Sequence, residues 1–259
     1  MAKFYWTVKQ NDFEWFLLRA GKPTASAMDK IITPGGKKPR EDTTERYMNR
    51  LLCEWITGVP YQGDDYQSAA MQKGHENEEP AANRFEFHKN VTLEKLGFVT
   101  TDDGLVGASP DRAIRLEGDR VIGVEIKSPI GPTQTGYLLR PELLREEYHV
   151  QVQSQIFVLE SDKAWLCADC ADCPTLPPVH LEIGRDAAFI REMETRLDAF
   201  LDQMLAKRER LEREFGPFKR PDYSKKDKPV GDCGDFGVGM ADFDDLQRLW
   251  EMKQAAAGI

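Results

Sequence analysis

The sequence predicts an α/β fold, and three observations lead to this prediction. Two pairs of strands rich in β-branched residues are expected, at 105–116 with 121–126 and at 163–167 with 179–183. Amphipathic patterns of helical period lie between and around these pairs, above all at 186–215. With 41% hydrophobic residues in 259, the chain has enough apolar side chains for a sizeable core. We therefore expect one large domain, or one domain with an appendage.

The net charge of −9 argues against a uniformly basic surface for nucleic acid, but the charge is unevenly distributed. Residues 1–50 carry ten Lys and Arg against six Asp and Glu, so a local basic channel could still bind DNA. The sequence has no run of 18 apolar residues and no signal peptide after Met1. We expect a cytoplasmic protein that has no membrane partner.

The N-terminal part is expected to be helical, with one break. Asp12 caps a helix that runs through Arg19, and the segment 21–23 (Gly-Lys-Pro) interrupts it before Thr24-Ala-Ser26 opens a second helix. Hydroxyls and free N–H groups at this second helix start would form an anion site. Arg19, one turn earlier, could complete it with a bidentate phosphate contact. Helix capping beside a surface arginine is the alternative that these residues leave open.

A helix is also expected at 81–88, with Pro80 in its first turn. Glu76, Glu78 and Glu79 would then crowd the helix start, where the helix dipole favours carboxylates. The interaction with the helix dipole is enough to explain the presence of two of these three glutamates. The third would complete a metal site if it lay near the first strand pair.

The remaining pattern consists of helices joined by polar links. Helices are expected at 44–57 and 142–158, and a Gly/Pro-rich link is expected at 129–137. Residues 217–239 are polar and rich in Gly and Pro, which predicts a linker. A final short helix capped by Asp242 follows this linker.

The residues best suited to catalysis lie on the first strand pair. If its turn is centred on Gly118, Asp111 lies opposite Glu125 and Ser109 lies opposite Lys127. Alternation along the strand puts Glu125 and Lys127 on one face. Two carboxylates can hold Mg²⁺, and a nearby lysine can orient or deprotonate water and offset developing charge. The set therefore suits phosphodiester hydrolysis, although any one of these residues alone could be a solvated surface charge.

Three cysteines form a Cys-x-x-Cys-x-x-Cys run at Cys167, Cys170 and Cys173. A zinc or iron–sulfur site would need a fourth ligand, such as Cys233 or Cys53. Because Cys167 lies on a predicted strand and points into a core, we expect the run to be structural and reduced. Metal binding is the alternative.

Asp111 with Glu125-Ile-Lys127 resembles the PD-(D/E)xK nuclease motif, and the resemblance extends along the chain to about residue 205. Segments that occur in the order of lambda-type phage exonucleases are Trp15-Phe-Leu-Leu-Arg19, Thr24-Ala-Ser26, 74–78, Ser109-Pro-Asp111, Glu125-Ile-Lys127-Ser-Pro129 and Tyr148-His-Val-Gln151-Val-Gln153. These enzymes form the viral alkaline exonuclease, or viral recombinase, branch of the superfamily. The resemblance implies a restriction-endonuclease-like core with a central mixed β-sheet flanked by helices. We assign this domain to 1–216, and a linker and short C-terminal helix to 217–259.

The resemblance also implies an activity. Members digest one strand of linear double-stranded DNA from 5′ to 3′ with Mg²⁺, for which Mn²⁺ substitutes, and leave a 3′ single-stranded overhang. They are typically ring-shaped homotrimers that work with a single-strand annealing protein in phage recombination, inside a bacterial host cell. Two alternatives remain open: a restriction-type DNA endonuclease, and a DNA-end-binding recombination scaffold with weak nuclease activity.

Site residues follow from the matching positions. Asp111, Glu125 and the backbone carbonyl of Ile126 would bind the metal, Lys127 would activate water, and Glu78 would assist from its helix. Residues expected at the 5′-terminal phosphate are Arg19, Thr24, Ser26, Ser109 and Gln151. Met71 lies where an apolar wedge would split the terminal base pair.

The sequence departs from the family pattern at two places. Arg112 replaces the usual glycine after the aspartate of Ser-Pro-Asp, which would alter the strand or add a phosphate contact. The family also has a further acid about ten residues before that aspartate. Here Thr101 has that spacing, so Asp102 or Asp103 would have to substitute.

Overall fold

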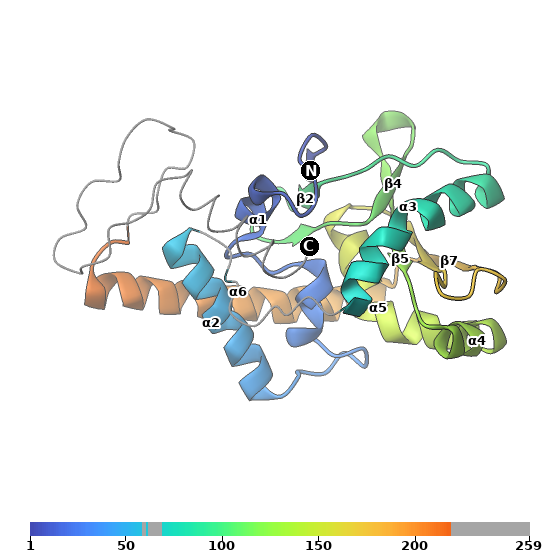
Figure 1. The fold of residues 1–259 in the computed structure, drawn as a ribbon. Coiled ribbons are helices and arrows are strands. Elements are labelled where there is room, and N and C mark those ends of the chain that lie inside the picture. Colours follow the sequence, from blue (N-terminus) through green and yellow to red (C-terminus); the bar gives the residue numbers. More distant parts are fainter. Residues whose placement is uncertain (59–60, 62–68, 219–259) are drawn as a thin grey trace.

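The computed structural model of the chain describes residues 1–58, 61 and 69–218, and for 69–76 it describes the backbone only. Two sheets are flanked by helices, as the predicted α/β class requires (Figure 1). The strands are β1 (Lys3–Tyr5), β2 (Phe98–Thr100), β3 (Gly107–Ala108), β4 (Arg112–Arg115), β5 (Val121–Lys127), β6 (Lys163–Ala168) and β7 (Val179–Gly184). The helices are α1 (Phe13–Arg19), α2 (Glu41–Thr57), α3 (Ala69–Lys89), α4 (Gly131–Leu139), α5 (Pro141–Val158) and α6 (Ala187–Phe215), with 3₁₀ turns η1 (Ala25–Lys30) and η2 (Glu117–Asp119).

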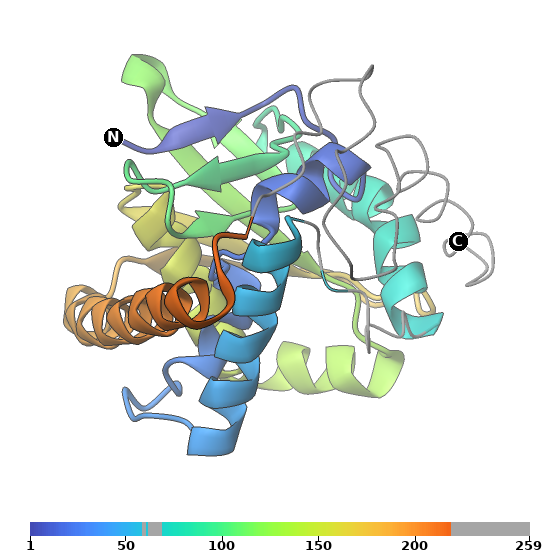
Figure 2. The same cartoon turned by 90° about the vertical axis from the view of Figure 1, so that its left-hand side faces the viewer.

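The larger sheet is mixed and has the order β4-β5-β6-β7. β4 and β5 are antiparallel, β5 and β6 are parallel, and β6 and β7 are antiparallel. The parallel pair needs a long connection, which α4 and α5 provide. The smaller sheet, β1-β2-β3, is antiparallel. Figure 2 shows it above α6, which is seen almost end-on beside α2.

Helices cover both faces of the larger sheet. Phe85 of α3 belongs to a cluster with the β5 residues Ile122, Val124 and Ile126. The opposite face packs against α5, whose Ile156 is fully buried in the main core. Because side chains alternate along a strand, the odd-numbered residues of β5 point toward α5. That face is the one that carries the charged residues of β5.

The register predicted for the first strand pair is confirmed. Arg112 pairs with Val124 and Arg115 with Val121, so the turn is centred on Gly118, whose φ is +72°. Extended by one residue, this register places Asp111 opposite Glu125. The second strand pair, β6 with β7, is also confirmed.

The prediction of one continuous strand at 105–116 was wrong. The chain leaves the smaller sheet after β3 and enters the larger one at β4, and the segment Ser109–Asp111 lies between them. Pro110 lacks an N–H group and cannot continue a ladder. The β4–β5 ladder begins at Arg112, so Ser109 lies outside it, and the Ser109 hydroxyl donates to the Gly97 carbonyl at 2.8 Å.

Two helix predictions were wrong. α3 begins at Ala69, so Pro80 lies inside the helix and not in its first turn. Glu78 and Glu79 are therefore mid-helix residues that gain nothing from a helix start. The predicted link at 129–137 contains α4, which begins at Gly131, has Pro132 in its first turn and buries Gln134 and Tyr137.

The predicted break in the N-terminal helix is confirmed. α1 ends at Arg19, and η1 follows as a 3₁₀ helix with Thr24 at its N-cap. Between them Gly21 has φ +71°, and its N–H donates to the buried Glu54 carboxylate at 3.0 Å. The helices predicted at 44–57, 142–158 and 186–215 are confirmed as α2, α5 and α6.

Asp186 caps α6 through hydrogen bonds from the N–H groups of Ala188 and Phe189. The predicted linker and helix beyond residue 218 lie outside the described residues. Within the described residues, no helix is long and apolar enough to cross a membrane.

Candidate active site

The charged residues of β5 form one compact group with α5. Nζ of Lys127 lies 2.6 Å from Oε1 of Glu125, as expected for side chains two apart on a strand. Gln151 of α5 bridges the two, since its Nε2 donates to Glu125 at 2.6 Å and its Oε1 accepts from Lys127 at 3.1 Å. The ring of Tyr148 lies 4.5 Å from the Lys127 ammonium. The predicted convergence of carboxylate and ammonium is therefore present.

Gln155 is a member of this group that the sequence reasoning did not assign. Its Nε2 donates to Oε2 of Glu125 at 2.5 Å, and its side chain is buried. Glu125 thus has a hydrogen-bonded partner on each oxygen. The four-residue spacing between Gln151 and Gln155, which places both on one helix face, was the available signal.

Asp111 stands beside this group at the end of β4. Its Oδ2 accepts the backbone N–H of Ile126 at 2.7 Å, which fixes the carboxylate against β5. Burial, followed by the nearby carboxylates of Glu125 and Glu78, raises the pKa of Asp111 well above its ordinary value. Burial acts to lower the pKa of Lys127, but the Glu125 and Asp111 carboxylates together raise it. A cation bound at this buried site would therefore stabilise the charged form of Asp111.

Glu78 approaches this centre from α3. Its Oε2 lies 3.8 Å from an Nη atom of Arg112, and its carboxylate raises the pKa of Asp111. The structure therefore brings together all four predicted catalytic residues. Asp102 and Asp103 lie elsewhere: Asp102 forms an ion pair with the N-terminal amine at 3.4 Å, and Asp103 accepts the Thr101 hydroxyl at 2.6 Å. Neither lies at the carboxylate pair.

The residues predicted to hold a 5′-phosphate gather mostly around β3. The guanidinium of Arg19 lies 4.1 Å from the ring of Trp15, and the indole N–H of Trp15 donates to the Ser109 hydroxyl at 2.7 Å. Thr24, which forms a bridge with Gly107, lies with its hydroxyl 3.4 Å from that of Ser26. Trp15 thus links Arg19 to Ser109, two residues predicted to bind the phosphate. The sequence had not indicated this role for Trp15.

Two predicted site residues are placed differently. Gln151 hydrogen-bonds with Glu125 and Lys127, so it belongs to the carboxylate group and not to the cluster around Arg19. α5 nevertheless packs against η1, which brings the two groups close in the fold. Met71 lies on the first turn of α3, and its side chain is outside the described residues.

Comparisons with known proteins agree with this geometry. The YqaJ-like viral recombinase domain family matches residues 14–164, which is more than half of the chain. The chain belongs to this family. The matched segment contains every residue that the sequence predicted for the site. None of the curated protein sequences with which the chain was compared matches it.

Solved structures extend the match to the fold of this viral recombinase domain. The alkaline exonuclease LHK-Exo from Laribacter hongkongensis is 29% identical, with a TM-score of 0.66 over 78% of this chain and 96% of that one. The structure of LHK-Exo in complex with dAMP gives the same values. A phage-related exonuclease from Haemophilus somnus 129PT, at 16% identity, has a TM-score of 0.51 over 72% of this chain and 96% of that one, and it shows the fold alone. The domain thus has the PD-(D/E)xK-like fold.

A divalent metal is implied by this fold, and the donor set fits one. Asp111 and Glu125 offer hard oxygen ligands next to each other, and because burial and the neighbouring carboxylates raise the pKa of Asp111, a cation bound there would stabilise its charged form. Among the residues that the structure describes, no three His, Cys, Asp or Glu side chains are grouped to hold a metal. Mg²⁺ needs no such cage, because it commonly uses one or two carboxylates together with water and substrate phosphate.

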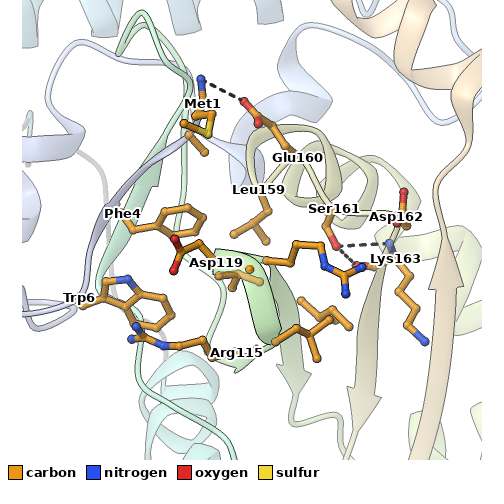
Figure 3. A pocket seen from close by; sticks show the side chains of 16 residues that line it. Met1, Phe4, Trp6, Arg115, Asp119, Leu159, Glu160, Ser161, Asp162 and Lys163 are labelled. Carbon is orange, nitrogen blue, oxygen red and sulfur yellow. Dashed lines mark hydrogen bonds and ion pairs between the residues drawn. The ribbon is translucent and has the colours of Figure 1, made fainter.

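A cavity lies away from these carboxylates. It has a volume of about 490 Å³ and lies at the turn end of the β4–β5 hairpin, whereas the carboxylates lie at the other end. Figure 3 shows Phe4 and Trp6 along one side, with Arg115 next to Trp6 and Glu160 paired with the N-terminal amine. The guanidinium of Arg115 lies 3.9 Å from the Trp6 ring. The candidate active site is therefore distinct from this cavity.

The cysteine run lies at the end of β6. Cys167 and Cys170 are buried, Cys173 is half-buried, and all three are free thiols. Burial raises the pKa of Cys167, which keeps it a neutral thiol. Cys53, one of the two candidate fourth ligands, lies on α2, and Cys233 is outside the described residues. The prediction of a reduced, structural run stands as a prediction.

Proposed function

We propose that this protein is a metal-dependent 5′→3′ exonuclease that digests one strand of linear double-stranded DNA and leaves a 3′ single-stranded overhang. The observation that carries the proposal is the convergence of Asp111, Glu125 and Lys127 on one face of the β4–β5 hairpin. Membership of the viral recombinase family and the likeness to alkaline exonucleases support it. We assign the activity to residues 1–216.

Each residue of the centre has a proposed task. Asp111, Glu125 and the carbonyl of Ile126 would hold Mg²⁺, for which Mn²⁺ would substitute, and the metal would supply Lewis-acid polarisation of the scissile phosphate. Lys127 would orient the attacking water and offset negative charge as the bond breaks. Gln151 and Gln155 would keep the Glu125 carboxylate in place, since each donates to one of its oxygens. Glu78 would assist from α3.

The direction of digestion rests on the cluster around β3. Arg19, Ser26 and Ser109 come from three different segments that meet there, and Thr24 lies beside Ser26. A guanidinium with neighbouring hydroxyls suits a terminal phosphomonoester, which carries nearly two negative charges. We propose that this cluster binds the 5′-phosphate while the next phosphodiester lies at the carboxylates, and that Met71 splits the terminal base pair.

We further propose the biological setting that the family implies. The enzyme would act in phage-type recombination in a bacterial host cell, as a ring-shaped homotrimer around DNA. Its 3′ overhang would be taken over by a single-strand annealing protein. Family membership supports this setting.

The proposal is tested with linear duplex DNA whose two strands carry different labels. One end carries a 5′-phosphate and the other a 5′-hydroxyl, and digestion with Mg²⁺ is followed strand by strand against a chelated control. We expect loss of the strand with the 5′-phosphate from its 5′ end, while circular duplex stays intact. Cutting of circular duplex would favour an endonuclease instead. DNA-end binding without digestion would favour a recombination scaffold.

A further inference from the structure

Arg112 occupies an unusual place next to the candidate active site. It is the first residue of β4 and follows Asp111 directly, but its side chain is on the α3 face of the sheet because neighbours on a strand alternate. The side chain is only 8% exposed. A buried guanidinium must have hydrogen-bond partners, because desolvation of an unpaired charge is costly. This burial also means that Arg112 does not offer the phosphate contact considered from the sequence.

Two of the partners of Arg112 belong to the site, and the third, Glu79, is the next residue along α3 after Glu78. One Nη atom donates to the backbone carbonyl of Asp111 at 2.6 Å and lies 3.8 Å from Oε2 of Glu78. The other donates to Oε2 of Glu79 at 2.7 Å, which Lys95 also contacts at 2.9 Å. One planar group therefore joins the end of β4 to two consecutive glutamates of α3. A guanidinium suits this task because its donors keep a fixed geometry.

This connection joins two groups that lie far apart in the sequence. Asp111 lies at the end of a four-residue strand, and Glu78 lies in the middle of a helix that contains Pro80. Pro80 removes one helical hydrogen bond, so α3 depends on tertiary contacts for its position there. Asn77 supplies one such contact by donating to the Ser128 hydroxyl at 2.8 Å. Arg112 supplies the contact on the Asp111 side.

We propose that Arg112 is a positioning residue that fixes the Glu78 carboxylate beside Asp111 and thereby sets the affinity of the carboxylate group for a divalent cation. The inference rests on the proposed function, because the cation matters only if the centre hydrolyses phosphodiesters. Outer contacts of this kind typically change metal affinity by about 10- to 100-fold. Arg112 itself touches neither cation nor DNA in this proposal.

The test compares Arg112→Met, which keeps length and loses charge, with Arg115→Met as the matched control. Arg115 is on the same strand and pairs with Glu94 through two hydrogen bonds, away from the carboxylates. Mn²⁺ binding is measured by calorimetry on the DNA-free full-length protein, and digestion is measured across Mg²⁺ concentrations. We expect Arg112→Met to weaken Mn²⁺ binding and raise the Mg²⁺ requirement by about tenfold or more. It should also lower kcat more than it raises KM for DNA ends. Arg115→Met should change none of these.

A double-variant cycle distinguishes positioning from general support of the fold. If Arg112 acts through Glu78, Arg112→Met should have little further effect on Mn²⁺ affinity in a Glu78→Gln background. An equal effect in both backgrounds, or unchanged Mn²⁺ affinity in Arg112→Met, would overturn the inference. Should Arg112→Met fail to fold, as judged by circular dichroism, Arg112→Lys enters the same cycle. The lysine keeps the charge but lacks the two separate Nη groups with which Arg112 contacts Asp111 and Glu79.

The two proposals fail in different ways. If the wild-type protein binds Mn²⁺ more tightly than Arg112→Met but digests no DNA, the exonuclease proposal is refuted and the positioning role stays intact. A wild-type exonuclease whose Mn²⁺ affinity ignores Arg112 would refute the positioning role alone. A wild-type protein that neither binds Mn²⁺ nor digests DNA would refute both.

Discussion

The ammonium of Lys127 lies 2.6 Å from Oε1 of Glu125, its second neighbour along β5, and both side chains face α5. Glu125 is buried, and Gln151 and Gln155 each donate to one of its oxygens. A buried carboxylate with these partners has little freedom to move. The position of the lysine is therefore set by the same contacts that hold the carboxylate.

We expect Lys127→Ala and Asp111→Ala each to slow DNA digestion by about 10³-fold or more. The first removes the charge that offsets developing negative charge, and the second removes a proposed metal ligand. Single-turnover digestion of end-labelled duplex measures the rate. Lys163→Ala is the control, since this exposed lysine on β6 pairs with Glu182 and lies far along the sheet from the carboxylates. Near-wild-type turnover by either Lys127→Ala or Asp111→Ala would refute the assignment.

Local patterns were sufficient to predict the centre of the fold. The turn at Gly118 fixes the register, and the register brings Asp111 to Glu125 without any tertiary information. Strand alternation then places Lys127 beside Glu125. The four-residue spacing of Gln151 and Gln155 likewise gives them a common face. These relationships depend only on neighbours in sequence and on one hairpin.

The missed features depend on tertiary contacts. Proline usually marks a helix start, so Pro80 suggested one, yet α3 continues through it while Asn77 is held by hydrogen bonds to Ser128 and Asp169. The strand expected at 105–116 divides because two different sheets take its halves, and a sequence pattern does not reveal which sheet a strand joins. The sequence shows that Arg112 departs from the family pattern, but its burial against Glu79 depends on how α3 packs.

Gly97 lets the N-terminal segment pack against β2. A Cβ atom at this position would lie 2.0 Å from the carbonyl oxygen of Val8, and the Gly97 carbonyl itself accepts from Trp15 and Ser109. We expect Gly97→Ala to lower the free energy of unfolding by about 1–3 kcal/mol, because the backbone must shift. Urea denaturation measures the change. Gly184→Ala is the control, because among the described residues, its chain neighbours aside, no heavy atom lies within 4 Å of its added Cβ. Equal midpoints for both variants would contradict this prediction.

His180 on β7 should make stability depend on pH. Burial, then Lys89 and His88 of α3, lowers the pKa of its imidazole to about 4, although Asp169 acts in the other direction. The unfolded chain binds a proton below about pH 6.5, and the folded protein does so only near pH 4. Stability that is present above pH 6.5 is therefore lost as the pH falls toward 4.

The His180 contribution is measured as a difference between variants. Wild type and His180→Gln are unfolded with urea at several pH values from 8 to 4, and the glutamine does not titrate. Because the ring is partly exposed, we expect wild type to lose about 1–2 kcal/mol relative to the variant over this range. A difference that stays constant with pH would show that the imidazole titrates normally in the folded protein.

Arg19 is expected to recognise the charge at the 5′ end. Its guanidinium lies over Trp15, whose indole holds the Ser109 hydroxyl, so the arginine is part of the cluster around β3. Two charge-assisted hydrogen bonds to a phosphomonoester would be lost in Arg19→Ala. We expect digestion from 5′-phosphorylated ends to slow by about 10- to 100-fold. Ends with a 5′-hydroxyl already lack the charge and should slow far less.

Measuring wild type and Arg19→Ala on 5′-phosphate and 5′-hydroxyl ends isolates this interaction, because effects unrelated to the terminal phosphate cancel. Arg46→Ala serves as the control, since this exposed arginine on α2 pairs with Asp42 one turn earlier and contributes only general positive charge. Arg46→Ala should slow digestion from both kinds of end slightly and by the same factor, and this effect should be larger at low salt. If Arg19→Ala also slows both ends by one factor, Arg19 is a general DNA contact. The 5′-phosphate would then have to be bound by the hydroxyls of Thr24, Ser26 and Ser109 without a guanidinium.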